Sequence, residues 1–208
     1  MAEKSPVMLD RPGTLFLQKW FGEVPPNMAL NIWTPQDKIS KWWHHIPSQH
    51  DINNIVKKGH DVYYGVCLGP QGLGKRQRIT SAEVTLMPGF WLDLDYGDNH
   101  KKKNLPATLE EALAAVAELP FQPSMTVKSG NGIHVYWMFK EPVIFEDRNQ
   151  RLEMEIMNRR WHQLVKNAWA KHGWGMDSVW DLARVLRVPG TYNYKDETPI
   201  KVELIHDG

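Results

Sequence analysis

The order of secondary-structure patterns after residue 88 restricts the fold more than any other feature of this chain. Residues 90–96 (FWLDLDY) have the aromatic and apolar content of a strand. Residues 105–120 (LPATLEEALAAVAELP) then show helical spacing, with Thr108 and Glu111 placed as a capping box near the start. A strand followed by a capped helix therefore begins this half of the sequence.

A second and a third strand come next, followed by a long helix. Residues 124–129 (SMTVKS) and 133–139 (IHVYWMF) flank the short connection GNG, which predicts a β-hairpin. Apolar residues at helical spacing then mark one face of the long helix. They are Met154, Met157, Trp161, Leu164, Val165 and Ala168.

Residues 200–205 (IKVELI) alternate like a final strand, after an insertion that runs from Asp177 to Lys195. This order is that of the split β-α-β, ferredoxin-like or RRM-like arrangement, whose first and third strands form the central pair of the sheet. We therefore predict an α+β protein of one domain with two lobes. Residues 1–88 would form an N-terminal α/β lobe, and residues 89–208 an RRM-like lobe.

The N-terminal lobe carries weaker patterns. Thr34 and the proline after it predict the start of a helix within residues 34–43 (TPQDKISKWW). A short helix is expected from Asp51 up to the next glycine. Residues 61–68 (DVYYGVCL) favour a strand, and residues 69–83 form a glycine- and base-rich loop.

Charge and cysteine content exclude several classes of function. The net charge of the 208 residues is only +1, so a nucleic-acid surface would have to be a local patch balanced by acids elsewhere. Cys67 is the only cysteine, which excludes an internal disulfide and a cysteine-rich zinc site. The N-terminus lacks the apolar core of a signal peptide, and no apolar run approaches membrane-span length. We expect a soluble, cytoplasmic protein.

Two carboxylates on one strand are the first candidate for chemistry. Side chains at positions i and i+2 of a strand share a face, so Asp93 and Asp95 project the same way. Their carboxylates repel each other unless a cation lies between them. This pair therefore predicts a cation-binding site at the C-terminal end of the first strand.

Groups suited to phosphate surround this pair in the predicted fold. Gly130 and Gly132 allow backbone amides to approach a ligand closely, and His134 follows them on the third strand. Arg184 and Arg187 share a face if their segment is helical, and guanidinium groups suit phosphate. Together with hard cations held by the carboxylates, these groups indicate phosphoryl transfer.

Each of these features also has a purely structural explanation. The segment DLDYGD can be a surface turn, or a calcium loop without the glycine and distal glutamate of an EF-hand. His134 can be a core histidine, and the SGNG segment can be no more than a hairpin turn. The phosphoryl-transfer interpretation depends on the predicted fold bringing all of them together.

Three motifs of the sequence resemble those of a known family. They are Asp93-Leu-Asp95, then Ser129-Gly-Asn-Gly-Ile-His134, and then Asp177 with the run from Asp181-Leu-Ala-Arg184-Val-Leu-Arg187 to Asn193-Tyr-Lys195. In this order and with these intervals they resemble the archaeo-eukaryotic primase (AEP) superfamily, above all the primase-polymerases of phages and plasmids. The resemblance covers residues 91–195, and the N-terminal lobe is similar in a less specific way.

The resemblance implies template-directed nucleotidyl transfer by a DNA primase-polymerase that extends primers, with primer initiation left open. It assigns metal binding and catalysis to Asp93, Asp95 and Asp177, with Asp181 as the alternative third ligand. It assigns nucleotide binding to Ser129, Gly130, Asn131, Gly132, His134, Arg184 and Arg187. We expect further DNA or phosphate contacts from Lys75, Arg76, Arg78, Asn193 and Lys195.

Asp177 is preferred to Asp181 because a helix beginning at Ser178 would give Asp181 a structural role. Asp181 would then occupy the acidic position of a capping box and pair with Arg184 one turn later. Asp177 would lie just before the helix and could turn toward the paired acids. The alternative is that Asp177 itself caps the helix.

The resemblance also implies cofactors and partners. Two Mg²⁺ or Mn²⁺ ions are expected and zinc is not, because one cysteine cannot supply the usual zinc element of these relatives. Expected partners are a single-stranded DNA template with its primer, dNTPs with NTPs as an alternative, and a helicase in the same or a separate polypeptide. No membrane partner is expected, and the location would be the cytoplasm of a host cell that carries the phage or plasmid.

Two other functions remain open from the sequence. A metal-dependent nuclease or phosphatase would also need the paired aspartates, although it has no use for the glycine turn and arginine motifs together. A non-catalytic single-strand-binding module for replication initiation would need neither the acids nor the histidine.

Overall fold

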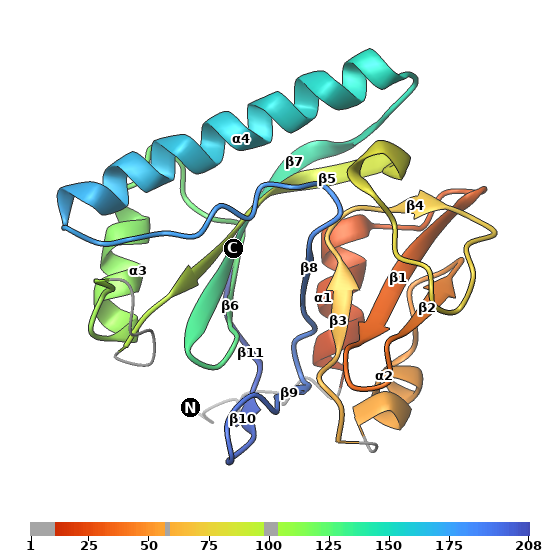
Figure 1. The fold of residues 1–208 in the computed structure, drawn as a ribbon, viewed down its shortest axis with the longest axis horizontal. Helices are drawn as coiled ribbons and strands as arrows, with labels where there is room; N and C mark the ends of the chain where they lie inside the picture. The colour runs from red at the N-terminus through yellow and green to blue at the C-terminus, as the bar shows by residue number, and fades with distance from the viewer. Residues whose placement is uncertain (1–10, 57–58, 98–103) are drawn as a thin grey trace, which may run out of the picture.

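Two β-sheets with helices between and around them make up the computed structural model, which describes residues 11–56, 59–97 and 104–208 (Figure 1). The first sheet has the strand order β2-β1-β3-β8, with β4 paired to β1. The second has the order β11-β6-β7-β5, and β9 pairs with β10 separately. The mixture of helices and antiparallel strands confirms the predicted α+β class.

The first sheet is formed mainly by the N-terminal part of the chain. Its strands are β1 (Met28–Thr34), β2 (Ile39–Trp43), β3 (Tyr63–Gly65), β4 (Gly69–Pro70) and β8 (Val185–Arg187). The helices α1 (Pro12–Phe21) and α2 (Gln49–Val56) lie beside it (Figure 1). Because β8 comes from the second half of the sequence, the two halves are interleaved in this sheet.

The helix predicted after Thr34 is wrong: β1 and β2 form a hairpin there. The Thr34 hydroxyl donates to the Asp37 carboxylate, and the Lys38 amide donates to the Pro35 carbonyl at 3.3 Å. Lys38 adopts the left-handed conformation, with φ of 53°. A threonine-proline pair can begin a turn as well as a helix, and this chain uses it for a turn. The short helix predicted from Asp51 is confirmed as α2.

The second sheet carries the elements predicted after residue 88. Its strands are β5 (Leu86–Asp95), β6 (Met125–Lys128), β7 (Gly132–Ile144) and β11 (Glu203–Asp207). The helices are α3 (Leu109–Ala117) and α4 (Arg148–Lys171), and shorter elements are η1 (Ser81–Glu83), β9 (Tyr192–Asn193) and β10 (Ile200–Lys201). Thr108 caps α3 as predicted, because its hydroxyl accepts from the Glu111 amide at 3.2 Å.

The position of β5 in the sheet differs from the ferredoxin-like prediction. The first and third strands, β5 and β7, do pair along most of their length. However, the last strand, β11, pairs with β6 rather than with β5, so the central strands are β6 and β7. The strand that carries the paired aspartates therefore lies at an end of this sheet.

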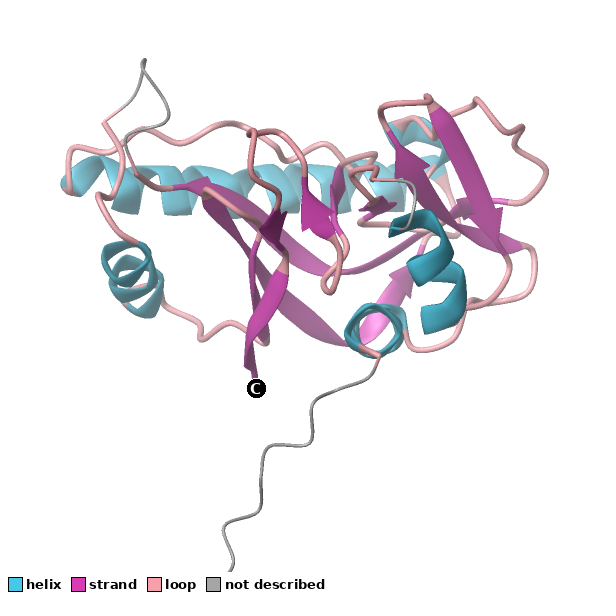
Figure 2. Ribbon diagram, turned by 90° about the horizontal axis from the view of Figure 1, so that it is seen from below, coloured by secondary structure: helices cyan, strands magenta, loops and turns pink. Residues whose placement is uncertain are grey.

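The two faces of the second sheet pack against different partners. Leu92, Leu94, Ile133 and Val135 pack against α3 and α4 in one apolar cluster. On the other face, the Tyr136 ring lies 5.3 Å from Phe16 and 5.0 Å from Trp20, measured between ring centroids. These two residues belong to α1, which also contacts the first sheet through Tyr64. Figure 2 shows α4 crossing the strands as one long helix.

The buried face of α4 agrees only in part with the predicted one: Trp161 and Val165 are buried as expected, and Met154 and Ala168 are partly buried. Met157 and Leu164 are about half exposed, whereas Asn158 and His162 are buried together with Trp161, Val165 and Trp169. The Asn158 amide donates to the Trp180 carbonyl at 2.8 Å, which explains why a polar residue lies there. The buried face of α4 therefore includes Asn158 and His162 in addition to part of the predicted apolar stripe.

One apolar cluster joins the two predicted lobes. It contains residues of α1, β1 and β3 together with residues of β6, β7 and β8. The division at residue 88 stays a prediction. In the described part of the chain, none of the helices combines the length and hydrophobicity that a bilayer span requires.

Candidate active site

Asp93 and Asp95 lie at the C-terminal end of β5, opposite residues of β7. Asp93 is in register with His134, and Asp95 is in register with Gly132. Since directly opposite residues of an antiparallel pair project to the same face, the acids and the histidine share the face turned away from α3 and α4. The side chain of Asp93 is 36% exposed, so its carboxylate reaches the surface.

The turn between β6 and β7 is closed tightly next to these acids. The Ser129 amide donates to the Gly132 carbonyl at 2.8 Å. Gly130 has φ of +116°, and a Cβ there would lie 2.4 Å from the Asn193 side-chain nitrogen. A Cβ on Gly132 would lie 2.8 Å from the Leu94 carbonyl. Both glycines are therefore required by the close approach of other parts of the protein. The predicted approach of their amides to a ligand stays a prediction.

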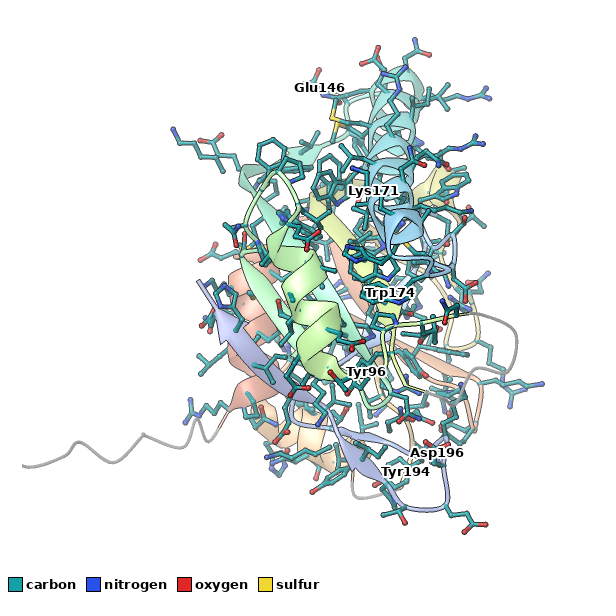
Figure 3. The ribbon with its side chains drawn as sticks, turned by 90° about the vertical axis from the view of Figure 1, so that its left-hand side faces the viewer. Tyr96, Glu146, Lys171, Trp174, Tyr194 and Asp196 are labelled. Carbon is teal, nitrogen blue, oxygen red and sulfur yellow. The ribbon has the colours of Figure 1, made fainter. Side chains whose placement is uncertain are left out.

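The segment after β9 is fastened to this turn. The Asn193 side-chain amide donates to the Ser129 carbonyl at 3.0 Å, and the Asn131 amide donates to the Asp196 carboxylate at 2.8 Å. The Tyr96 hydroxyl donates to the Gly130 carbonyl at 3.0 Å. Figure 3 shows Tyr96 and Asp196 at the same end of the molecule, far from Glu146. These contacts fix the turn from both sides.

A pocket of about 350 Å³ opens between the two sheets at this end. Most of the residues that the sequence predicted as functional meet in it. Its lining consists of Tyr63, Asp93, Asp95, Ser129, Asn131, Gly132, Asp177, Arg187, Asn193 and Lys195. Carboxylates from β5 and from the segment after α4 thus face cations from β8 and from the segment after β9.

Arg187 is held in the pocket wall by a buried acid. The Arg187 Nε donates to the Asp61 carboxylate at 3.3 Å, and the side chain of Asp61 is only 9% exposed. The Arg187 guanidinium also lies 4.9 Å from the centroid of the Tyr63 ring. Salt bridge and cation–π contact together orient the guanidinium.

Asp61 is a site residue that the sequence did not reveal. Besides Arg187, its carboxylate accepts from the Gln36 amide at 2.8 Å and from the Tyr194 backbone amide at 3.1 Å. It therefore connects the first sheet, β8 and the segment that carries Lys195. A lone aspartate before an apolar strand gives no signal for this role, since its partners are 126 and 133 residues away.

His134 lies beneath the pocket and not in its lining. Its side chain is 2% exposed, and its Nε2 lies 3.6 Å from an Asp93 oxygen, beyond hydrogen-bond distance. Burial lowers the pKa of His134 to about 3, and the positive charge of Arg187 acts in the same direction. The imidazole is therefore neutral at neutral pH in this structure. The assignment of His134 to nucleotide binding stays a prediction.

Asp177 and Asp181 lie in different surroundings. Asp177 lines the pocket, whereas Asp181 does not and instead forms a salt bridge with Arg184. The helix predicted from Ser178 is wrong, because residues 174–180 form no helix in this structure. The predicted pairing of Asp181 with Arg184 is nevertheless confirmed, since a turn brings the two residues together.

The two arginines do not share a face. Arg187 belongs to β8 and Arg184 lies just before it, so the helical premise was wrong. Residues three apart in an extended segment project to opposite faces. Accordingly Arg187 lines the pocket and Arg184 does not. The assignment of Arg184 to nucleotide binding finds no support in this geometry.

The predicted DNA contacts fall into two groups. Asn193 and Lys195 line the pocket. Lys75, Arg76 and Arg78 are exposed on the loop between β4 and η1, away from the pocket lining. Any role of the loop residues therefore concerns a part of the ligand that lies outside the pocket.

The carboxylates suit hard divalent cations. Mg²⁺ is usually held by one or two carboxylates together with waters and substrate phosphates, and less often by a cage made of protein alone. Asp93 and Asp95 on one face of β5, with Asp177 on the same pocket, fit this pattern. Within residues 11–56, 59–97 and 104–208, no three His, Cys, Asp or Glu side chains form a ready-made metal cluster. A cation bound here would share ligands with its substrate.

Solved structures with a similar fold are known. The AEP domain of the primase-polymerase of cyanophage S-2L superposes with a TM-score of 0.60 at 20% sequence identity, covering 94% of this chain and 89% of that domain. The primase RepB′ gives a TM-score of 0.46 at 11% identity, covering 94% of this chain and 55% of that one. No protein-family model and no curated protein matches the sequence. The chain therefore has the fold of an AEP domain.

Proposed function

We propose that this protein is a template-directed nucleotidyltransferase, a DNA primase-polymerase that extends primers. The observation that carries the proposal is the pocket itself. Three aspartates, a glycine turn and two cations from five separate segments line one pocket of about 350 Å³. Asp93, Asp95 and Asp177 are the acids, and Arg187 and Lys195 are the cations.

The acids would hold Mg²⁺ or Mn²⁺, and these ions would supply positive charge that stabilises the charge developing during phosphoryl transfer. Asp93 and Asp95 are fixed for this role by the pairing of β5 with β7. Asp177 approaches from the segment after α4 and completes the acidic side of the pocket. Asp181 is engaged with Arg184 outside the pocket, which supports the choice of Asp177.

The opposite side of the pocket would bind the triphosphate of the incoming nucleotide. The turn at residues 129–132 lies close to Asp95, and Ser129, Asn131 and Gly132 line the pocket, where this turn would contact the phosphates. Arg187 and Lys195 add positive charge that balances a polyphosphate. Asp61 keeps Arg187 in place from behind.

The partners follow from this proposal. The substrates would be dNTPs, with NTPs as the alternative, added to a primer on a single-stranded DNA template. A helicase, in the same or a separate polypeptide, would supply the single strand. We place the reaction in the cytoplasm of a cell that carries a phage or plasmid, on the basis of the sequence resemblance alone.

Primer extension with matched variants tests the proposal. The wild-type protein should add dNTPs to a labelled primer on a single-stranded template when Mg²⁺ or Mn²⁺ is supplied, and EDTA should stop the reaction. Asp177→Asn should lower the extension rate about 10³-fold, since several kcal/mol of charge stabilisation are lost. Asp181→Asn is the control and should stay within tenfold of the wild type.

The same assay separates the alternatives. A nuclease would shorten the primer and leave dNTPs unused, and a non-catalytic module would bind the primed template without changing it. If Asp181→Asn abolishes extension and Asp177→Asn does not, the third acid is Asp181.

A further inference from the structure

A row of flat side chains crosses the first sheet, starting from the pocket. Trp33 of β1 is in register with Tyr63 of β3, and Tyr63 is in register with Arg187 of β8. Register partners project to the same face of a sheet, so these three side chains lie side by side. The Arg187 guanidinium lies 4.9 Å from the Tyr63 ring, and the Tyr63 and Trp33 ring centroids are 5.6 Å apart.

A second guanidinium ends the row. The Arg78 guanidinium lies 4.7 Å from the centroid of the Trp33 ring. Arg78 belongs to the loop after β4, which is fastened to β2 by hydrogen bonds from the Ser40 amide to the Lys75 carbonyl at 2.7 Å and from the Trp42 indole to the Gly74 carbonyl at 3.2 Å. The loop thus presents Arg78 over Trp33 from an anchored backbone.

The row differs from the packed aromatic residues of the core. Trp20, Trp91 and Trp169 are fully buried, whereas Trp33 and Tyr63 are only partly buried and Arg78 is exposed. The row has a cation at each end and two aromatic rings between them. Tyr63 and Arg187, at its inner end, form part of the pocket wall. Core packing explains neither the exposure nor the two flanking cations.

We propose that a single-stranded DNA segment that enters the pocket lies along the row Arg78, Trp33, Tyr63 and Arg187. Bases of any sequence can stack on aromatic rings and on guanidinium planes, and arginines can neutralise the flanking phosphates. Arg78, at the outer end, is placed to neutralise a phosphate of the strand, whereas Arg187, at the inner end, marks where the strand would reach the pocket. The identification of the strand as the template rests on the proposed function.

Binding without catalysis tests the row directly. Fluorescence anisotropy would measure the affinity of a labelled oligothymidylate for the protein without metal or nucleotide. Trp33→Leu should weaken binding about 5- to 150-fold, the range for the loss of one stacked base. Trp33→Phe should recover most of the affinity because the ring is kept.

The salt dependence of binding tests the contribution of Arg78, at the outer end of the row. Arg78→Gln should lower the slope of log affinity against log salt by about 0.7, the value for one phosphate contact on a single strand. Trp33→Leu should leave this slope unchanged. Arg159→Gln is the matched control, because the Arg159 guanidinium lies 5.1 Å from the Trp180 ring outside the row; it should change neither affinity nor slope.

The experiments can overturn the row and the polymerase proposal separately. Binding that depends on Trp33 and Arg78 in a protein that incorporates no nucleotide would overturn the polymerase proposal and keep the row. A folded Trp33→Leu variant with affinity within twofold of the wild type would overturn the row, as would an equal loss for duplex DNA. If Trp33→Leu does not fold, an unchanged salt slope for Arg78→Gln overturns the row.

Discussion

The two faces of the β5–β7 pair have opposite compositions although they alternate residue by residue. Leu92 and Leu94 are at most 1% exposed and pack against α3 and α4. Asp93 and Asp95, between and after them, line the pocket on the other face. A shift of the strand by one residue would exchange the leucines with the acids.

The apolar face therefore fixes the register that the polar face needs. Burial of Leu92 and Leu94 opposite Val135 and Ile133 makes one register far more favourable than its neighbours. The mutual repulsion of the two carboxylates opposes their placement on one face. In this pair, stability resides on one face and the proposed chemistry on the other, and each face can be changed separately.

The largest effect is expected on the polar face. Asp93→Ala or Asp95→Ala should lower the rate of nucleotide incorporation about 10³-fold or more, because several kcal/mol of charge stabilisation are lost. The melting temperature should stay within a few degrees of the wild type, since removing one carboxylate relieves repulsion. Single-turnover primer extension and thermal melting measure the two quantities. Extension near the wild-type rate would contradict the metal assignment.

The apolar face should respond in the opposite way. Leu94→Ala should lower the free energy of unfolding by about 2–5 kcal/mol, the range for a buried leucine truncated to alanine. Incorporation at a temperature where the variant is still folded should remain within about tenfold of the wild type. Urea denaturation followed by an extension assay at 10–15 °C would show this. A variant of full stability would mean that this face does not fix the register.

A third change tests Asp61, which is buried and also holds a residue of the pocket. Asp61→Asn removes the buried negative charge beside Arg187, and breaking one side of such a pair costs about 3 kcal/mol. It should also raise the KM for the nucleotide more than it lowers kcat, because Arg187 loses the group that orients it.

Asp61→Glu serves as the conservative comparison, since it restores the charge at a slightly different reach. Its KM for the nucleotide should lie between those of the wild type and of Asp61→Asn. Equal KM values for the wild type and Asp61→Asn would reduce Asp61 to a purely structural residue.

Much of the fold could be predicted where local signals agree with tertiary packing. The capping residue Thr108, the glycine turn after Ser129 and the alternation in β5 all gave correct elements. The turn after Thr34 was missed because its residues also suit a helix N-terminus. The pairing of β11 with β6 could not be predicted, because strand order depends on contacts between distant segments.

The residues of the site also divide into those that local signals predict and those that depend on the folded chain. Asp93 and Asp95 could be predicted because strand alternation alone places them on one face. Arg184 was misplaced because a helix was assumed where β8 begins. Asp61 could not be found, since only the folded chain brings it to Arg187 and Tyr194.

The smallest effect is expected for His162, a buried histidine of α4. Burial lowers the pKa of His162 on α4 to about 4, Arg184 acts in the same direction, and Asp181 and the Trp91 backbone oppose it. The ring is therefore neutral in the folded protein at neutral pH.

This burial makes stability depend on pH in a definite direction. Between about pH 6.5 and pH 4 the unfolded chain binds a proton at His162 that the folded chain does not, so stability is full above this range and falls as the pH falls through it. Lowering the pH from 7 to 5 should cost the wild type roughly 1–2 kcal/mol from this residue. His162→Leu should lose that part of the dependence, and urea denaturation of both proteins at pH 7 and pH 5 measures the difference, because every other titrating group is shared. Equal pH dependence in the two proteins would contradict a buried neutral imidazole at position 162.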